Sequence, residues 1–209
     1  DATFETLDIG YASVRWLMSA SPSFGAIGPR HVDPRTGEIL DADIGFESLS
    51  SRSQRNLRAQ TLAGAPAFDA VLGQPLLAGQ DHCQHGDLAA EQLSYALDLM
   101  EARGDIDPAS PQAEAFVQDY VKDTIMHEVG HALGLRHNFR ASRVYTEAQL
   151  SDAEFTRTHG TTGSVMEYNA VNLPAPGRPP VTAFQTMLGP YDHWAIEYAY
   201  KPIAAPDEP

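Results

Sequence analysis

The feature that most constrains this 209-residue chain is the spacing of three histidines in residues 127–137, which read HEVGHALGLRH. His127 and His131 are one helical turn apart, so on a helix both imidazoles project from one face with Cβ atoms about 6 Å apart. That separation allows two ring nitrogens to meet one zinc ion at about 2.0–2.1 Å. Residues 127–131 are therefore predicted to be helical and to supply two metal ligands.

His137 can join the same metal only if the helix ends before it. On a continuous helix His137 would lie about 9 Å further along the axis than His131. Gly134 resolves this, because glycine accepts the left-handed conformation that ends a helix and turns the chain. We therefore expect His137 to return as the third ligand. Three nitrogens leave a fourth position open for water, which is typical of catalytic and not of structural zinc sites.

Glu128 lies about 100° around the helix from His127, beside the metal and not on it. That position suits a general base acting on zinc-bound water. With 8 histidines in 209 residues, three at fixed spacing arise by chance at about one start position in 18,000. The alternative is an amphipathic helix that carries histidines by coincidence.

The amino-acid composition limits the classes of partner that the chain is expected to bind. The net charge is −14, which argues against nucleic acid or an anionic membrane surface and is compatible with secretion or calcium binding. No apolar run approaches the roughly 18 residues that a membrane span needs. A single cysteine, Cys83, excludes an internal disulfide framework. Because the chain begins at Asp1 without a signal peptide, we expect a mature form or an excised fragment.

The first third of the chain predicts strands. Residues 11–18 are rich in β-branched and aromatic residues, and residues 24–32 and 39–46 flank a turn-like DPRTGE segment, which indicates a hairpin. Residues 39–46 alternate apolar and polar side chains, as expected for a strand with one buried face that could form a sheet edge. Residues 50–62 are predicted to be helical.

The segment Asp81–Asp87 (DHCQHGD) allows two interpretations. It could hold a second metal or bring the Cys83 thiolate near the zinc. Alternatively it is a polar loop in which Asp87 caps the next helix.

Helices are predicted over four later segments. One covers 88–103 and ends at Gly104, and another starts at Ser110-Pro111 and runs into His127. A short helix is expected within 146–158, and a last one over 190–200.

The downstream segment Gly163–Asn169 reads GSVMEYN. Together with the three-histidine motif it resembles the metzincins, zinc endopeptidases with a methionine-containing turn beneath the metal. Four blocks, 14–46, 127–142, 162–174 and 188–202, are similar to a family of large bacterial zinc-dependent metalloproteases whose flanking regions are domains of unknown function.

This resemblance implies a role for each site residue. His127, His131 and His137 match the zinc ligands, Glu128 the general base, and Met166 the residue of the Met-turn, an apolar floor and not a ligand. Tyr168 matches a position at which some metzincins carry a tyrosine that binds the zinc or swings away from it. The alternative for Tyr168 is a packing role near the cleft.

We therefore expect an α+β zincin-like fold in a single catalytic domain, residues 1–209. The upper lobe, 1–137, would hold a mixed sheet, a backing helix and the active-site helix. The lower lobe, 138–209, would be irregular and carry the Met-turn and the C-terminal helix.

The expected activity is hydrolysis of peptide bonds in a protein or peptide, with one catalytic zinc and the substrate laid along residues 39–46. Two alternatives stay open: a zinc-binding pseudo-protease that acts as a partner-binding module, and a zinc-dependent amidase or small-peptide hydrolase. We expect a bacterial, secreted or periplasmic and cell-envelope protein that is monomeric, with no nucleic acid partner and no membrane span.

Overall fold

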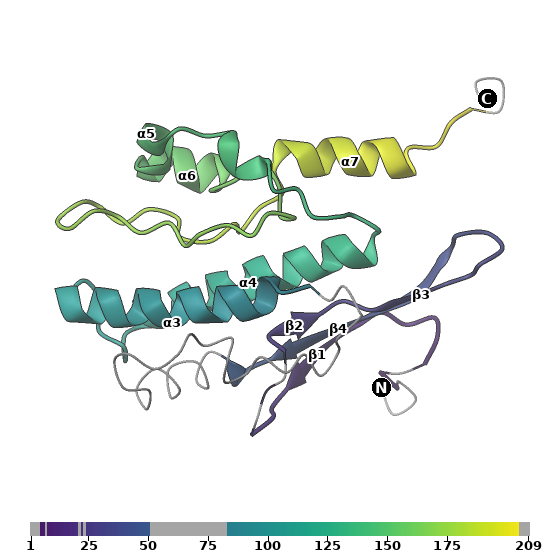
Figure 1. Cartoon of the computed structure of the whole chain (residues 1–209), viewed down its shortest axis with the longest axis horizontal. Helices are drawn as coiled ribbons and strands as arrows, with labels where there is room; N and C mark the ends of the chain where they lie inside the picture. Colours follow the sequence, from purple (N-terminus) through teal and green to yellow (C-terminus); the bar gives the residue numbers. More distant parts are fainter. Residues whose placement is uncertain (1–4, 7, 21, 23, 51–82, 205–209) are drawn as a thin grey trace, which may run out of the picture. The chain divides into compact units, whose positions relative to one another are not determined.

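The computed structural model describes residues 5, 6, 8–20, 22, 24–50 and 83–204 (Figure 1). The chain forms two compact units, Asp1–Ala113 and Glu114–Pro209. Its secondary structure is α+β, with a mixed sheet and several helices, as the sequence predicts. Apart from Ser50, the predicted helix over 50–62 lies outside the described residues, as do Asp81 and His82. The single-domain organisation and the lobe boundary at residue 137 stay predictions.

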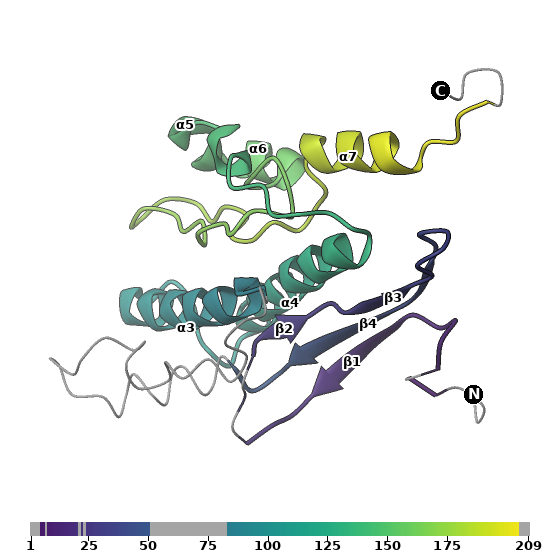
Figure 2. The ribbon, with the colours of Figure 1, turned by 45° about the vertical axis from the view of Figure 1, so that its right-hand side comes forward.

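The sheet of the first unit is organised around its longest strand, β4 (Ile39–Glu47). β1 (Ser13–Leu17) runs parallel to β4, whereas β2 (Ala26–Ile27) and β3 (Arg30–Val32) run antiparallel to it (Figures 1 and 2). From Asp43 onward β4 is paired on both sides, so the sheet-edge prediction is wrong for residues 43–46. Among the described residues, 39–42 pair only with β3.

The predicted hairpin is present, but its first arm is divided. β3 and β4 are joined by a turn in which the Asp33 amide donates to the Glu38 carbonyl at 2.9 Å. A continuous strand over residues 24–32 is not formed, because Pro29 lies between β2 and β3 and has no N–H to donate to a ladder. Its carbonyl instead accepts the Asp43 amide at 3.0 Å.

Both faces of β4 are buried, although its alternating sequence predicts one buried and one exposed face. Ile44 and Phe46 are buried on one face, and Asp41 and Asp43 are buried on the other. Asp43 accepts a hydrogen bond from the Ser13 hydroxyl, and Asp41 accepts the His31 amide at 3.1 Å. The polar face of the strand is thus covered and not open to solvent.

The helix of the first unit is α3 (His85–Arg103), which contacts β2. It ends as predicted at Gly104, which has a left-handed φ of 73°. Its start differs from the prediction: the N-cap position is Gln84, and Asp87 lies inside the first turn, where an acidic side chain interacts favourably with the helix dipole.

The second unit is built on α4 (Pro111–Ala132), whose first three residues precede the unit boundary. The predicted start is confirmed, since the Ser110 hydroxyl accepts the Ala113 amide at 3.2 Å. Phe116 and Tyr120 pack edge-on against Phe184, with ring centroids 5.1 and 6.0 Å apart. These contacts fix α4 against the segment that leads to the last helix.

In the second unit, α4 lies on one side of the long loop that precedes α7, and the remaining helices lie on the other side (Figures 1 and 2). The helix predicted within 146–158 is two helices, α5 (Glu147–Leu150) and α6 (Ala153–His159), because Thr146 and Asp152 each cap a separate start. The last helix, α7 (Pro190–Tyr200), is confirmed.

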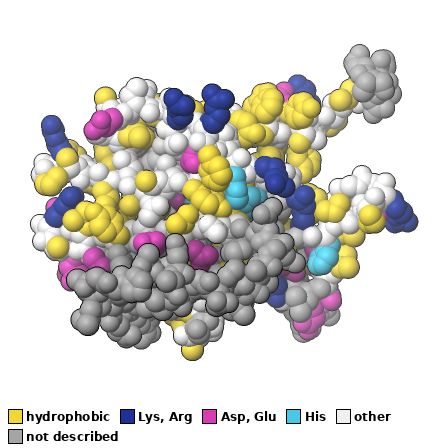
Figure 3. All heavy atoms as spheres, in the orientation of Figure 1, with side chains coloured by type: hydrophobic (Ala, Val, Ile, Leu, Met, Phe, Trp, Pro, Cys, Tyr) yellow, Lys and Arg dark blue, Asp and Glu magenta, His cyan; other side chains and the backbone are white. Residues whose placement is uncertain are grey.

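Hydrophobic side chains gather on the surface over α7 (Figure 3). Trp194 and Tyr198 are exposed there with stacked rings, whereas Ala195 is buried. None of the described helices combines the length and apolar character that crossing a bilayer requires.

Candidate metal centre

The C-terminal end of α4 shows how the sequence separates His131 from His137. The Gly134 amide donates to the His131 carbonyl, and the Leu135 amide donates to the Gly130 carbonyl, each at 2.9 Å. This pair of bonds is a Schellman motif, which needs a left-handed residue at Gly134, and its φ is 92°. The helix thus ends where the sequence predicts, and the chain reverses before His137.

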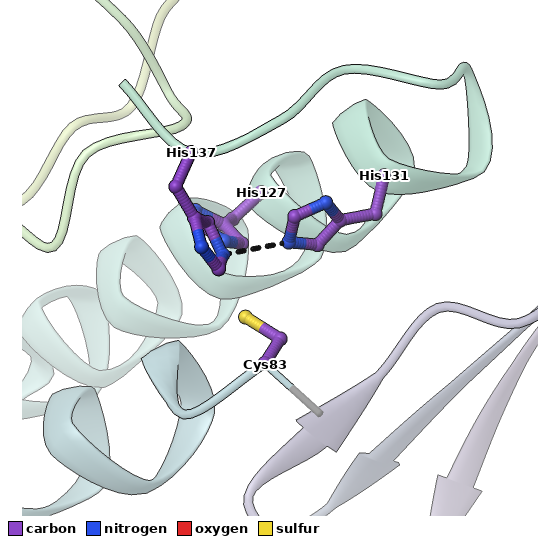
Figure 4. A group of neighbouring side chains, drawn as sticks. All are labelled: Cys83, His127, His131 and His137. Carbon is purple, nitrogen blue, oxygen red and sulfur yellow. Dashed lines mark hydrogen bonds between the residues drawn. The ribbon is translucent and has the colours of Figure 1, made fainter. Parts of the chain in front are cut away.

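The three histidines converge (Figure 4). The ring centroid of His131 lies 4.8 Å from that of His127 and 4.7 Å from that of His137. The Nε2 atoms of His131 and His137 are 3.0 Å apart. Two nitrogens bound tetrahedrally to one zinc would be about 3.3 Å apart, so this separation is close to that of a shared ion.

Two backbone carbonyls determine the tautomers of the helical ligands. Nδ1 of His127 lies 2.6 Å from the Val165 carbonyl oxygen, and Nδ1 of His131 lies 3.0 Å from that of Leu135. A carbonyl oxygen only accepts, so each Nδ1 carries the proton and each Nε2 is left as the acceptor nitrogen. This is the arrangement that orients metal-binding imidazoles.

The third histidine lies in an aromatic cluster. The Tyr168 hydroxyl is 3.2 Å from His137 Nε2, and the Phe139 ring stacks on the His137 ring at 5.3 Å. Burial lowers the pKa of His137, and the nearby His131 and Arg136 lower it further. A lowered pKa favours the neutral imidazole, which is the form that binds metals.

Glu128 and Met166 lie in the protein interior. Glu128 is 1% exposed, one position after His127 on α4, and Met166 is 0% exposed. A Cβ atom on Gly130 would lie 2.3 Å from Met166 Sδ, so the methionine packs directly on the backbone of α4 between the two helical ligands. This position agrees with the apolar floor that the sequence resemblance implies.

Two buried carboxylates hold the Met166 loop and were not assigned from the sequence. Glu167 accepts the amides of Ser142 and Tyr168, both at 3.0 Å. Asp192, in the first turn of α7, accepts the Val165 amide at 2.9 Å. An acidic residue in the first helical turn is an ordinary sequence signal. It says nothing about a bond to a segment 27 residues earlier.

The donor set suits zinc. Three converging imidazoles, two of them with Nδ1 fixed as the protonated nitrogen, are a usual ligand set for catalytic zinc. The described residues form no second group of three or more donors apart from these histidines, so neither a second metal in segment 81–87 nor a calcium site gains support. A thiolate ligand from Cys83 stays a prediction, because Cys83 belongs to the first unit.

Residues 109–209 match a protein-family model described as Met-zincin. No curated protein and no solved structure matches the chain. The matched region begins two residues before α4 and includes the three histidines, Glu128, Met166 and Tyr168.

Proposed function

We propose that this chain is a zinc-dependent endopeptidase, on the premise that residues 109–209 match the Met-zincin family model. One observation carries the proposal: three histidines converge, the two on α4 present Nε2 as the acceptor nitrogen, and the buried Glu128 lies on the same helix as these two. A metal held only for folding does not need that glutamate.

Glu128, Tyr168 and Met166 have different roles in the proposed hydrolysis. Bound zinc would supply Lewis acidity toward water and the scissile carbonyl. Glu128 takes a proton from the attacking water and passes it to the leaving amine. The Tyr168 phenol, close to His137, donates a hydrogen bond to the oxygen that becomes negative in the transition state. Met166 supports the ligands from below without touching the substrate.

The rest of the proposal concerns the setting of this activity. The substrate is a protein or peptide, and the acidic charge disfavours nucleic acid. The enzyme acts as a monomer in the periplasm, at the cell envelope or outside a bacterial cell. Because residues 43–46 are paired on both sides, main-chain pairing of the substrate is proposed only for residues 39–42 of β4.

The test is cleavage of casein and of short peptides by the zinc-loaded chain, by the chelated chain and by Glu128→Ala. We expect casein cleavage that chelation abolishes and zinc restores. Glu128→Ala should keep one zinc per chain and lose about 10²–10⁴-fold in turnover, because its carboxylate is a base and not a ligand.

Other outcomes identify the alternatives. Stoichiometric zinc without cleavage of either substrate would indicate a pseudo-protease, and cleavage of short peptides alone would indicate a small-peptide hydrolase. Loss of zinc in Glu128→Ala, or near-normal turnover, would refute the assignment of Glu128.

A further inference from the structure

Asp192 is a buried carboxylate with three hydrogen bonds. The side chain is on the first turn of α7, and the residue is 1% exposed. Its Oδ2 accepts the Gly189 amide at 2.8 Å and the Val165 amide at 2.9 Å. Its Oδ1 accepts the Ser164 hydroxyl at 2.5 Å, within the range of short charge-assisted bonds. Only the bond to Gly189 is needed to cap the helix.

The Ser164 hydroxyl extends this contact toward the metal centre. While it donates to Asp192, its oxygen accepts the Met166 amide at 3.0 Å. That amide belongs to the same peptide group as the Val165 carbonyl, and this carbonyl accepts Nδ1–H of His127 at 2.6 Å. The bonds form one chain from carboxylate to hydroxyl, peptide group and imidazole.

The donors and acceptors of this series of hydrogen bonds follow one direction, with each donor on the His127 side and each acceptor on the Asp192 side. A hydroxyl that donates to a carboxylate becomes a better acceptor, and a peptide group whose N–H is bonded has a more negative carbonyl oxygen. The Val165 carbonyl therefore holds the proton of His127 more firmly, and Nε2 of His127 becomes a stronger donor to a metal. A carboxylate bonded directly to a ligand histidine acts in this way.

We propose that Asp192 is a positioning residue for the metal ligand His127, acting through Ser164 and the Val165–Met166 peptide group. This relay fixes the orientation and tautomer of His127 and strengthens its binding of zinc. The inference rests on the proposed function only for the identity of the metal.

The test compares Asp192→Asn and Ser164→Ala with the parent chain. Asp192→Asn preserves volume but removes the charge, and Ser164→Ala deletes the central hydroxyl while leaving two of the three bonds of Asp192. Zinc affinity is measured by competition with a chelator, and the Nδ1–H proton of His127 is observed by NMR in metal-free protein. We expect each variant to bind zinc about 10–100-fold more weakly. The Nδ1–H resonance should move upfield, because its hydrogen bond weakens.

Thr156→Val is the matched control. Thr156 is a buried hydroxyl of the same unit that donates to the Asp152 carbonyl at 3.1 Å and accepts the Thr182 amide at 3.2 Å. Neither of these bonds leads to a histidine, so this variant should keep the parent zinc affinity and the His127 resonance.

Three results would overturn the relay: parent-like zinc affinity and an unmoved resonance in a folded Ser164→Ala chain, equal weakening in Thr156→Val, or a parent that binds no zinc. If Asp192→Asn fails to fold, Ser164→Ala decides. A parent that binds zinc but cleaves no peptide would contradict the endopeptidase proposal and leave the relay intact.

Discussion

The contact between Gly130 and Met166 gives a quantitative test of how the site is packed. An alanine Cβ at position 130 would lie 2.3 Å from Met166 Sδ, and Met166 is 0% exposed. Favourable contacts between heavy atoms lie at about 3.5–4.0 Å, so the sulfur would have to move by more than about 1 Å. Because Met166 is fully buried, the sulfur cannot relieve the clash by moving into solvent.

Two effects of Gly130→Ala oppose each other. Alanine is about 1 kcal/mol better than glycine in a helix interior, whereas overpacking a filled core costs about 1–3 kcal/mol. The clash is severe, so we expect a net loss of up to about 2 kcal/mol in the free energy of unfolding. In a Met166→Ala background the sulfur is absent, and Gly130→Ala should instead stabilise by up to about 1 kcal/mol.

The measurement is a double-mutant cycle by chemical denaturation of the zinc-saturated protein. We expect the effect of Gly130→Ala to change sign between the two backgrounds, which gives a coupling free energy of about 1–3 kcal/mol. Gly130→Ala that stabilises the parent chain, or two substitutions that add independently, would show that Met166 does not pack on α4 as described.

Three further predictions follow from the site and its surroundings. Tyr168→Phe should lose about 10²–10³ in turnover with zinc content and Tm unchanged, whereas Met166→Leu should cost less than about 1.5 kcal/mol in stability; a parent-like Tyr168→Phe would leave Tyr168 only a packing role. Burial raises the pKa of Asp123 to about 8, so the folded chain binds its proton more tightly than the unfolded chain and stability falls as pH rises from about 4 to 8. Asp123→Asn should flatten that dependence in denaturation series, and an unchanged slope would contradict it. Zinc at 1,000 times its Kd should stabilise the chain by about 4 kcal/mol, a shift that chelation removes and that His131→Ala should lack.

Local signals in the sequence predicted the parts of the fold that depend on neighbouring residues. Ser110 and Pro111 gave the start of α4, and Gly134 gave its end, because caps and breakers act within a few residues. The alternation of β4 was misleading for a physical reason. Asp41 and Asp43 looked solvent-exposed, but tertiary hydrogen bonds allow both carboxylates to be buried in a central strand.

The same distinction between local and distant signals applies to the metal centre. The spacing of His127 and His131 is a property of any helix, so the sequence predicted which side chains share a face. It could not predict which ring nitrogen of each carries the proton. For His131 the acceptor is Leu135, in the turn that Gly134 makes, and for His127 it is Val165, 38 residues away.

A backbone carbonyl carries no residue-type signature, and so no motif reveals its presence beside a ligand. On an isolated helix both imidazoles would exchange tautomers and rotate, and a metal would have to select one arrangement among several. In the folded second unit, the loop that Ser164 and Asp192 stabilise fixes one tautomer and one orientation of His127 before the metal binds. Zinc affinity should therefore depend on residues beyond the three-histidine motif. A peptide of residues 111–137, which keeps all three histidines, should bind zinc far more weakly than the folded chain.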